Sequence, residues 1–360
     1  MQINCTKEEL ARALSIVRVS VSSRSTLPVL SCILLRACDG LYLSATNLST
    51  FVTTLVDTET ATFTPHVSIA IPYRRLSDVV ANASDNITMI PKGDSVEVKW
   101  GRSKVSIKTM LADDFPVIPE FFGGVMVDAE EFGKAIDRVS FSAYEDEQTV
   151  LGGILASLNN GKLSLVATDR NRLSVSTCST EDERGGVAII PASRMNEIRR
   201  LITGRECLIS FGESRLGFQS GDTTFFSQVL AGTFPDYNQV IPFDHTLPIT
   251  AEFFSSEFLG IVKAARVVSM DYNDYLEMEV GNGKIAISCK TVEGDFDAEF
   301  DAETVGELHF GVSAKFLYDW LNNVGAARGK LMLRDEGSFA KLVPVGQDSI
   351  HCFGLMHLRR

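Results

Sequence analysis

The sequence predicts an α+β protein built from three tandem copies of one module, each with two helices and a predominantly antiparallel sheet. Three observations support this fold class: a strand that recurs at a constant interval, a helix before it and a helix after it. The strand reads DGLYLSATN from Asp39, GKLSLVATD from Gly161 and GKIAISCKT from Gly283, and both intervals are 122 residues. Similarity at a fixed period indicates a repeated structural unit.

An amphipathic helix is predicted before the strand in each third. The stretch EELARAL at 8–14 is echoed by EEFGKAI at 130–136 and, more loosely, by EFLGIVK at 257–263. In the first copy Thr6 is followed three residues later by Glu9, which is typical of a capped helix N-terminus.

A second, shorter helix is predicted after the strand in each third. The three copies read PYRRLSDVVANAS from Pro72, PASRMNEIRRLIT from Pro191 and SAKFLYDWLNNV from Ser313. A chain of 360 residues is too long to fold around a single hydrophobic core. We expect module boundaries near residues 124 and 246, which gives modules at 1–123, 124–246 and 247–360.

Composition and the N-terminal stretch predict a cytoplasmic protein. Hydrophobic residues make up 45% and charged residues 22% of the chain, as in ordinary soluble domains. No apolar run is long enough to cross a bilayer, and MQINCTKEEL lacks the basic and hydrophobic regions of a secretory signal. We therefore expect no membrane association.

Patterns of catalysis or metal binding are absent from the sequence. The seven cysteines form no C-x-x-C pair and the five histidines show no metal-ligand spacing, so we expect free thiols and no metal. There is no nucleophile elbow, phosphate-binding loop or dinucleotide fingerprint. We expect no cofactor, no catalytic residue and a function in binding.

Charge is distributed unevenly along the chain. The six predicted helices together carry +4, so the rest of the chain carries −16, because the whole has a net charge of −12. If all six helices faced one cavity, that cavity would attract a polyanion through its phosphates, without base specificity. Helices in general are rich in Lys and Arg, so an ordinary surface explains the same count.

Two predicted strands have opposite charges on one face. Residues 295–303, DFDAEFDAE, alternate between acidic and apolar side chains, whereas residues 102–109, RSKVSIKT, place Arg102, Lys104 and Lys108 on one face. Either strand could simply be a charged edge that prevents aggregation. Alternatively, the third module of one chain pairs head to tail with the first module of another, and two chains close a ring of six modules.

Taken together, these features resemble the family of the bacterial DNA polymerase III beta subunit, the beta sliding clamp. The resemblance covers essentially the whole chain, in the order and spacing of short motifs. They are TLPVL at 26–30, GRS at 101–103, ATDRNRL at 167–173, FPDY at 234–237 and MHLR at 356–359.

The resemblance implies a ring-shaped homodimer around duplex DNA, with helices lining the hole and sheets on the outer rim. Such a processivity factor tethers the polymerase by topology, so weak and sequence-independent phosphate contacts suffice. The implied partners are DNA, a second copy of the chain, and the replicative polymerase, clamp loader and repair proteins. The proteins would bind through short hydrophobic motifs in a pocket between the second and third modules.

The resemblance also implies roles for individual residues. The implied DNA-binding positions are Arg24, Arg74 and Arg200, with Arg75, Arg194 and Arg199 as basic neighbours. The implied dimer contacts are Arg102, Lys104, Val105 and Ile107 on one side, and Val267, Val268, Asp297, Glu299, Asp301 and Glu303 on the other. The implied pocket consists of Leu151, Thr168, Arg170, Asn171, Arg172, Leu173, Pro235, Val240 and Met356, with Arg172 and the loop amides fixing the peptide backbone.

The sequence departs from the family pattern in three loops. Arg170 and Asn171 stand where the family usually has glycine and histidine, and Asn238-Gln239 replaces a basic pair. Gln148, Thr149 and Val150 stand where arginine and tyrosines are usual in a loop that contacts DNA. These departures predict weaker loop contacts to DNA and different partner peptides. They also leave open a divergent clamp-like scaffold that binds proteins without encircling DNA.

Overall fold

A computed structural model describes the chain as two compact units. The described residues are 2–22, 24–57, 62–63, 66–84, 86–269, 274–292, 294–336, 339–346 and 352–356, the last by backbone only. The first unit comprises Met1–Ala129 and Arg200–Val229, and the second comprises Glu130–Arg199 and Leu230–Arg360. This division follows sheets that continue from one third of the chain into the next, and the three-module boundaries stay a prediction.

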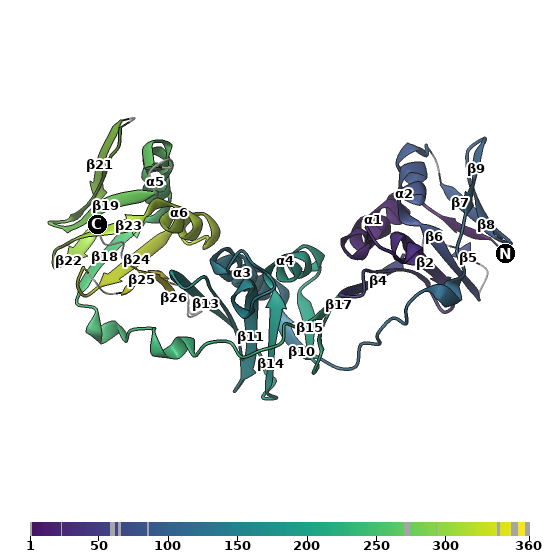
Figure 1. Cartoon of the computed structure of the whole chain (residues 1–360), viewed down its shortest axis with the longest axis horizontal. Helices are drawn as coiled ribbons and strands as arrows, with labels where there is room; N and C mark the ends of the chain where they lie inside the picture. The colour runs from purple at the N-terminus through teal and green to yellow at the C-terminus, as the bar shows by residue number, and fades with distance from the viewer. Residues whose placement is uncertain are drawn as a thin grey trace. The chain divides into compact units, whose positions relative to one another are not determined.

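The same order of elements occurs in each third: a strand, a helix, a group of strands, a helix and three strands (Figure 1). The first third contains β1 (Ile3–Cys5), α1 (Lys7–Val17), β2 (Cys32–Ala37), β3 (Leu41–Thr46), β4 (Thr50–Val56), β5 (Thr62–Phe63), β6 (Val67–Pro72), α2 (Tyr73–Asn82), β7 (Ile87–Lys92), β8 (Ser95–Trp100) and β9 (Ser103–Lys108).

The second third contains β10 (Val125–Asp128), α3 (Ala129–Val139), β11 (Gly153–Asn159), β12 (Lys162–Thr168), β13 (Arg172–Ser179), β14 (Gly186–Pro191), α4 (Ala192–Leu201), β15 (Glu206–Phe211), β16 (Arg215–Ser220) and β17 (Thr223–Gln228). The last contains β18 (Ile249–Phe254), α5 (Ser255–Ser269), β19 (Tyr275–Gly281), β20 (Lys284–Lys290), β21 (Asp295–Asp301), β22 (Glu303–Val305), β23 (Leu308–Ser313), α6 (Ala314–Asn323), β24 (Arg328–Leu333), β25 (Phe339–Pro344) and β26 (Cys352–Met356).

The predicted repeat is confirmed at the level of strands and helices. The recurring stretch forms β3, β12 and β20, and each forms an antiparallel hairpin with the next strand in the same register. Thus Leu43 lies opposite Thr54, Leu165 opposite Ser176, and Ile287 opposite Ala298. All six predicted helices form, and the Glu9 N–H donates to the Thr6 hydroxyl at 3.3 Å, as expected of an N-cap.

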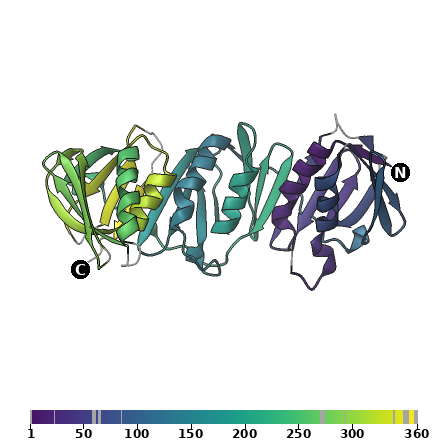
Figure 2. The same ribbon diagram turned by 90° about the horizontal axis from the view of Figure 1, so that it is seen from above.

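Two antiparallel sheets make up the first unit. One has the strand order β5-β1-β7-β8-β9 and the other β10-β15-β16-β17-β4-β3-β2-β6. Helix α1 packs against α2, β3 and β4, so its apolar residues are buried against the larger sheet (Figures 1 and 2). Pairing of β17 with β4 joins strands of the middle third to strands of the first in one sheet.

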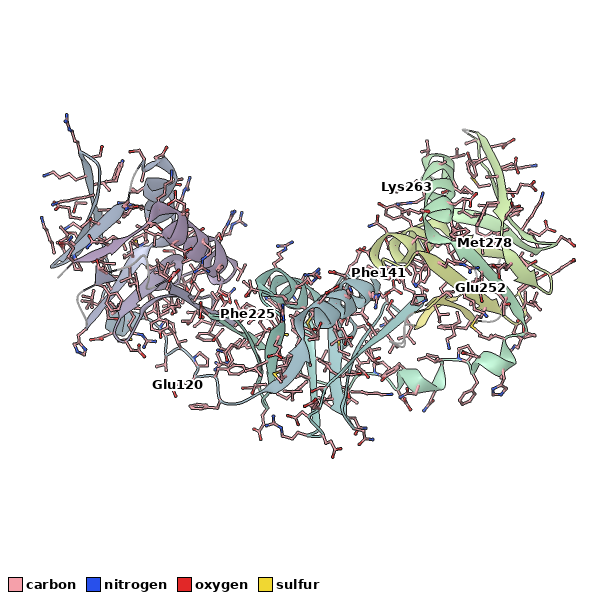
Figure 3. The ribbon with its side chains drawn as sticks, turned by 180° about the vertical axis from the view of Figure 1, so that it is seen from behind. Glu120, Phe141, Phe225, Glu252, Lys263 and Met278 are labelled. Atoms are coloured by element: carbon pink, nitrogen blue, oxygen red, sulfur yellow. The ribbon has the colours of Figure 1, made fainter. Side chains whose placement is uncertain are left out.

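The second unit repeats this arrangement with the middle and last thirds. Its sheets have the strand orders β14-β11-β12-β13-β26-β25-β24-β18-β22 and β21-β20-β19-β23, and β13 pairs with β26 across the border between the thirds. Helices α5 and α6 pack on one another and enclose a core with both sheets. Phe253 packs edge-on against Phe258 at 4.9 Å, and Met278, labelled in Figure 3, lies in the same core.

Six cysteines are free thiols, as the sequence predicts: Cys5, Cys32, Cys38, Cys178, Cys207 and Cys289. The seventh, Cys352, belongs to a strand whose side chains lie outside the described residues. Burial raises the pKa of Cys5 to about 12, and burial and the Asp128 charge raise the pKa of Cys207 to about 12. These thiols therefore stay protonated and act as small apolar core residues.

Candidate functional site

The predicted pocket residues all belong to the second unit, and five of them lie at 168–173, where β12 ends and β13 begins. Leu173 is 3% exposed and joins a small apolar cluster with Phe234, against which Leu151 and Tyr237 pack as half-buried side chains. Burial raises the pKa of Tyr237, so its hydroxyl stays protonated at neutral pH. This cluster provides an apolar floor near the surface.

Two further predicted pocket residues are exposed, and a third is described by its backbone only. Pro235 is exposed, and Val240 follows a short turn with 55% of its surface exposed. Strand β26 runs beside β13, with Leu355 opposite Arg172, so the backbone of Met356 lies one residue beyond this pair. The side chain of Met356 is outside the described residues.

The tight turn at 168–172, which joins β12 to β13, contains four of the predicted pocket residues. The Thr168 hydroxyl donates to the Arg172 carbonyl at 2.7 Å and accepts from the Arg170 N–H at 3.2 Å. Asp169 Oδ1 accepts from the N–H groups of Asn171 at 3.0 Å and Arg172 at 2.9 Å. The Asn171 and Arg172 amides are therefore satisfied within the turn and are not left over to fix a peptide backbone.

Arg172 is buried, which differs from the expectation that its side chain fixes a bound peptide. Its guanidinium is 6% exposed and pairs with Asp169 Oδ2 at 2.9 Å and with Asp319 Oδ2 at 2.5 Å. It also lies over the rings of Phe316 at 4.6 Å and of Phe141, labelled in Figure 3, at 5.7 Å. Asp319 and Phe316 belong to α6, so Arg172 connects the middle third to the last.

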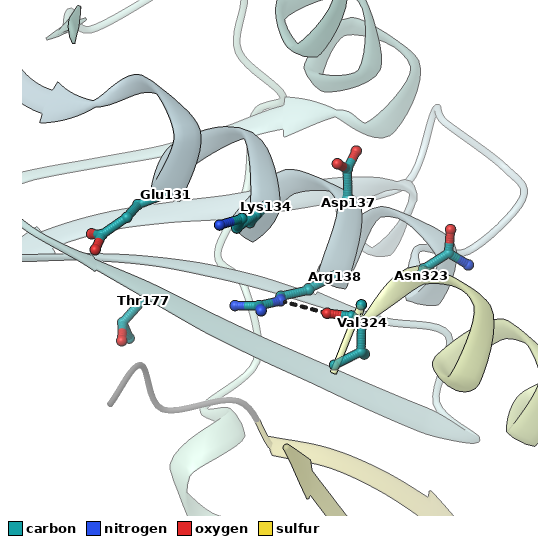
Figure 4. A pocket seen from close by; sticks show the side chains of 8 residues that line it. Glu131, Lys134, Asp137, Arg138, Thr177, Asn323 and Val324 are labelled. Carbon is teal, nitrogen blue, oxygen red and sulfur yellow. Dashed lines mark hydrogen bonds between the residues drawn. The ribbon is translucent and has the colours of Figure 1, made fainter. Parts of the chain in front are cut away.

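A second buried arginine makes the same connection (Figure 4). Arg138 on α3 is 8% exposed, and its Nε donates to the Val324 carbonyl at the C-cap of α6, 3.1 Å away. The pair borders a cleft of about 440 Å³ that Glu131, Lys134 and Thr177 also line. Burial lowers the pKa of Arg138. Arg138 and Arg172 thus both hold α6 against the middle third.

Sequence reasoning missed the partners of these two arginines. Asp319 lies 147 residues from Arg172 along the chain, and Val324 lies 186 residues from Arg138. A spacing pattern cannot reveal such pairs, because only the fold brings the two positions together. Tyr144, whose ring lies beneath Arg170 at 5.9 Å, was missed for the same reason.

Strand β9 ends the smaller sheet of the first unit, as expected of the basic strand. Lys104 and Lys108 are exposed, Val105 is half-buried and Ile107 is 2% exposed, which confirms the predicted alternation. Arg102 is exposed in the turn before β9. Strand β9 therefore has exposed basic side chains on one face and apolar side chains on the other.

The acidic stretch forms the edge strand β21, but that strand is shorter than predicted. Asp295, Asp297, Glu299 and Asp301 are exposed, whereas Phe300 is 4% exposed on the other face. The strand ends at Asp301, because the Ala302 N–H donates to the Gly283 carbonyl and the chain then enters another sheet.

Glu303 therefore lies in β22, beside β18, where its carboxylate accepts from Arg328 Nη2 at 2.6 Å. On α5, Val267 is 82% exposed, whereas Val268 packs against the core. Glu303 and Val268 therefore differ from Val267, Asp297, Glu299 and Asp301, which are exposed.

The six predicted DNA-binding arginines fall into two groups. Arg24, Arg74, Arg75 and Arg200 are exposed, and no carboxylate among the described residues pairs with them. Arg194 pairs with Glu197 at 2.7 Å and Arg199 with Asp137 at 2.9 Å, so their charges are partly neutralised within the chain.

Two negative findings concern only the described residues. No group of three or more His, Cys, Asp and Glu side chains could hold a metal ion there. None of the helices in that part of the chain is long and apolar enough to span a membrane.

Comparison with protein families matches two consecutive stretches. Residues 1–119 match the N-terminal domain of the DNA polymerase III beta subunit, and residues 126–236 match the central domain of that subunit. Together the two matches cover more than half of the chain.

Individual proteins show similarity over the full length. The beta sliding clamp of Pseudomonas aeruginosa is 27% identical over 353 residues, covering 94% of this chain and 95% of that protein. A crystal structure of a DnaN sliding clamp from the same species, bound to griselimycin, has a TM-score of 0.92 and 26% identity, with all of both chains covered. The Bacillus subtilis sliding clamp shares the fold alone, with a TM-score of 0.93, 20% identity, and coverage of 100% of this chain and 99% of that one.

Proposed function

The chain belongs to the DNA polymerase III beta subunit family, and from this we propose that it is a sliding clamp. In this proposal two chains form a ring around duplex DNA, and the ring tethers the polymerase and other replication and repair proteins. Its three modules span 1–123, 124–246 and 247–360. It acts in the cytoplasm as a non-catalytic subunit without a cofactor.

One observation carries the proposal of a ring: equivalent strands pair at both borders between successive thirds of the chain. Strand β4 of the first third pairs with β17, the last strand of the next third, and β13 pairs with β26 in the same way. The equivalent of β4 and β13 in the last third is β21, and the equivalent of β17 and β26 in the first third is β9. Both are edge strands within the described residues.

The same rule gives a register for the pairing of β21 with β9 of a second chain. In the first unit Thr224 lies opposite Thr53 and Phe225, labelled in Figure 3, opposite Val52. The registers of the β16–β17 and β8–β9 hairpins make Thr224 equivalent to Lys104 and Phe225 equivalent to Val105. The registers of the β3–β4 and β20–β21 hairpins make Thr53 equivalent to Asp297 and Val52 equivalent to Phe296.

Two residues further along the same antiparallel register, Arg102 lies opposite Glu299. Opposite charges therefore face each other at Lys104–Asp297 and Arg102–Glu299, with apolar residues on the reverse face. A head-to-tail contact of this kind is heterologous, and two copies of it close a ring of two chains. Val267 and Asp301 are proposed as further contacts beside it, whereas Val268 and Glu303 contribute less because both are engaged within the chain.

DNA contacts are proposed for the arginines that are exposed and unneutralised. Arg24, Arg74, Arg75 and Arg200 supply phosphate contacts, and Arg194 and Arg199 supply weaker ones because each has a carboxylate partner. With a net charge of −12 the chain as a whole repels DNA, so retention depends on ring closure rather than on tight contacts.

Partner peptides are proposed to bind over the apolar floor formed around Leu173 and Leu151. Thr168, Asn171, Pro235, Val240 and Met356 surround that floor, and an aromatic or leucine side chain is the anchor that suits it. Arg172 contributes by holding the pocket walls together, since its guanidinium is buried in ion pairs.

We predict a dimer of two 39.4 kDa chains at micromolar concentration in sedimentation velocity. Two edge-strand interfaces per ring add their free energies, so the dimer should persist on dilution further than a single contact of this size allows. A monomer at micromolar concentration would contradict the ring and favour the protein-binding scaffold.

A further inference from the structure

Arg170 occupies a backbone position that suits glycine. Its φ is +78°, in the left-handed region that costs an L-residue roughly 1–2 kcal/mol. The bonds to Thr168 and Asp169 described above impose this conformation, so the direction of the Arg170 side chain is fixed by the turn. A strained residue beside a binding surface suggests a functional reason for the side chain.

The first third of the chain contains the same turn with another residue at its tip. Leu48 has a φ of +73°, its N–H donates to the Thr46 hydroxyl at 2.9 Å, and Asn47 Oδ1 accepts from the Ser49 and Thr50 N–H groups. The turn therefore forms whichever side chain its tip carries. Arginine at position 170 is not needed to build it.

The Arg170 guanidinium lies at the edge of the apolar floor and remains available. It is exposed, lies 5.9 Å above the Tyr144 ring, and pairs with no carboxylate among the described residues. The neighbouring Asp169 is already paired with Arg172. The Tyr144 N–H donates to the Leu151 carbonyl at 2.9 Å, which fixes the Arg170–Tyr144 pair beside one wall of the floor.

We propose that Arg170 makes this pocket selective for peptides that carry a carboxylate next to the hydrophobic anchor. The anchor occupies the floor at Leu173 and Leu151, and the carboxylate pairs with the guanidinium above Tyr144. Desolvation by the Tyr144 side chain and by the peptide strengthens this ion pair relative to one in open water. The inference rests on the proposed peptide-binding function and names the partner class of that site.

The test uses three synthetic peptides, each with one fluorescent label and a Leu-Phe anchor. The first has Asp before the anchor, the second has Asn there, and both have amidated C-termini. The third has Asn and a free C-terminal carboxylate directly after the anchor. Fluorescence anisotropy with the full-length chain at 50 mM NaCl should show about fivefold tighter binding of a carboxylate peptide than of the neutral one. The first and third peptides distinguish a side-chain carboxylate from a terminal one.

Variants assign the preference to Arg170. R170G suits the left-handed backbone and should bind the carboxylate peptides and the neutral peptide with equal affinity. R170K should keep part of the preference, and L48G, in the matching turn of the first third, should keep all of it. A preference that survives in R170G, or binding of all three peptides with equal affinity by the unaltered chain, would overturn the inference alone. Failure of every peptide to bind would also overturn the proposed pocket.

Discussion

Reversing the charges on one edge strand should weaken dimerisation, and mixing two oppositely reversed variants should restore it. In R102E/K104E both edges of the chain are acidic, and in D297K/E299K both are basic, so neither variant pairs with itself. In a mixture the acidic β9 of R102E/K104E pairs with the basic β21 of D297K/E299K. The unaltered acidic β21 of the first variant then pairs with the unaltered basic β9 of the second. We expect each variant alone to dissociate roughly 100-fold more readily, because each ring has two such interfaces.

Sedimentation velocity of the two variants, separately and mixed at equal concentration, provides the measurement. The double variant K162E/R184E lowers the net charge as much as R102E/K104E does, at exposed positions outside β9 and β21, and should remain dimeric. The effect should shrink at 1 M NaCl, where charges are screened beyond about 3 Å. A dissociation constant equal to that of the unaltered chain for either reversed variant alone, or a mixture that dimerises no better than its components, would reject the proposed register.

Loss of Arg172 should destabilise the second unit by about 3 kcal/mol. Truncation leaves the carboxylates of Asp319 and Asp169 without their partner and removes the contact with the Phe316 ring. Breaking a buried ion pair typically costs about 3–5 kcal/mol, and the lower end applies because the Asp319 side chain is 19% exposed. Urea unfolding of R172A should therefore shift to a lower midpoint.

The core residue Trp320 on α6 reports this transition once Trp100 is replaced by Phe in every variant. R184A removes an ion pair in which the arginine is 65% exposed and should change stability by less than about 1 kcal/mol. Replacing Arg172 together with Asp319 in R172M/D319L should recover part of the loss, since apolar pairs often substitute for buried ion pairs, although Asp169 still loses its partner. An R172A midpoint equal to that of R184A would contradict the structural role of Arg172.

Much of the fold follows from local patterns in the sequence. The repeated strand, the six helices and the alternation on β9 and β21 all depend on residues close together in the chain, where side-chain periodicity reflects which face is buried. Thr6 could be placed as an N-cap because capping involves residues three positions apart.

The rest depended on contacts between distant residues or on backbone geometry. The end of β21 could not be predicted, because acidic and apolar residues continue to alternate through Glu303 after the chain changes sheets at Ala302. The left-handed conformation of Arg170 could not be predicted either, since an arginine carries no signal of positive φ. The pocket residues were named by resemblance and stay a prediction, and the burial of the Arg172 guanidinium between Asp169 and Asp319 depends on a contact that the sequence does not reveal.

Retention on circular DNA tests the central proposal most directly. The chain would be loaded onto nicked circular DNA with the clamp loader of its own organism and then separated by gel filtration at high salt, before and after linearisation. Because a closed ring is held by topology and salt screens phosphate contacts, we predict co-elution with the circles and loss from the linear DNA. A dimer that is never retained on the circles would contradict the sliding clamp and support a scaffold that binds proteins only.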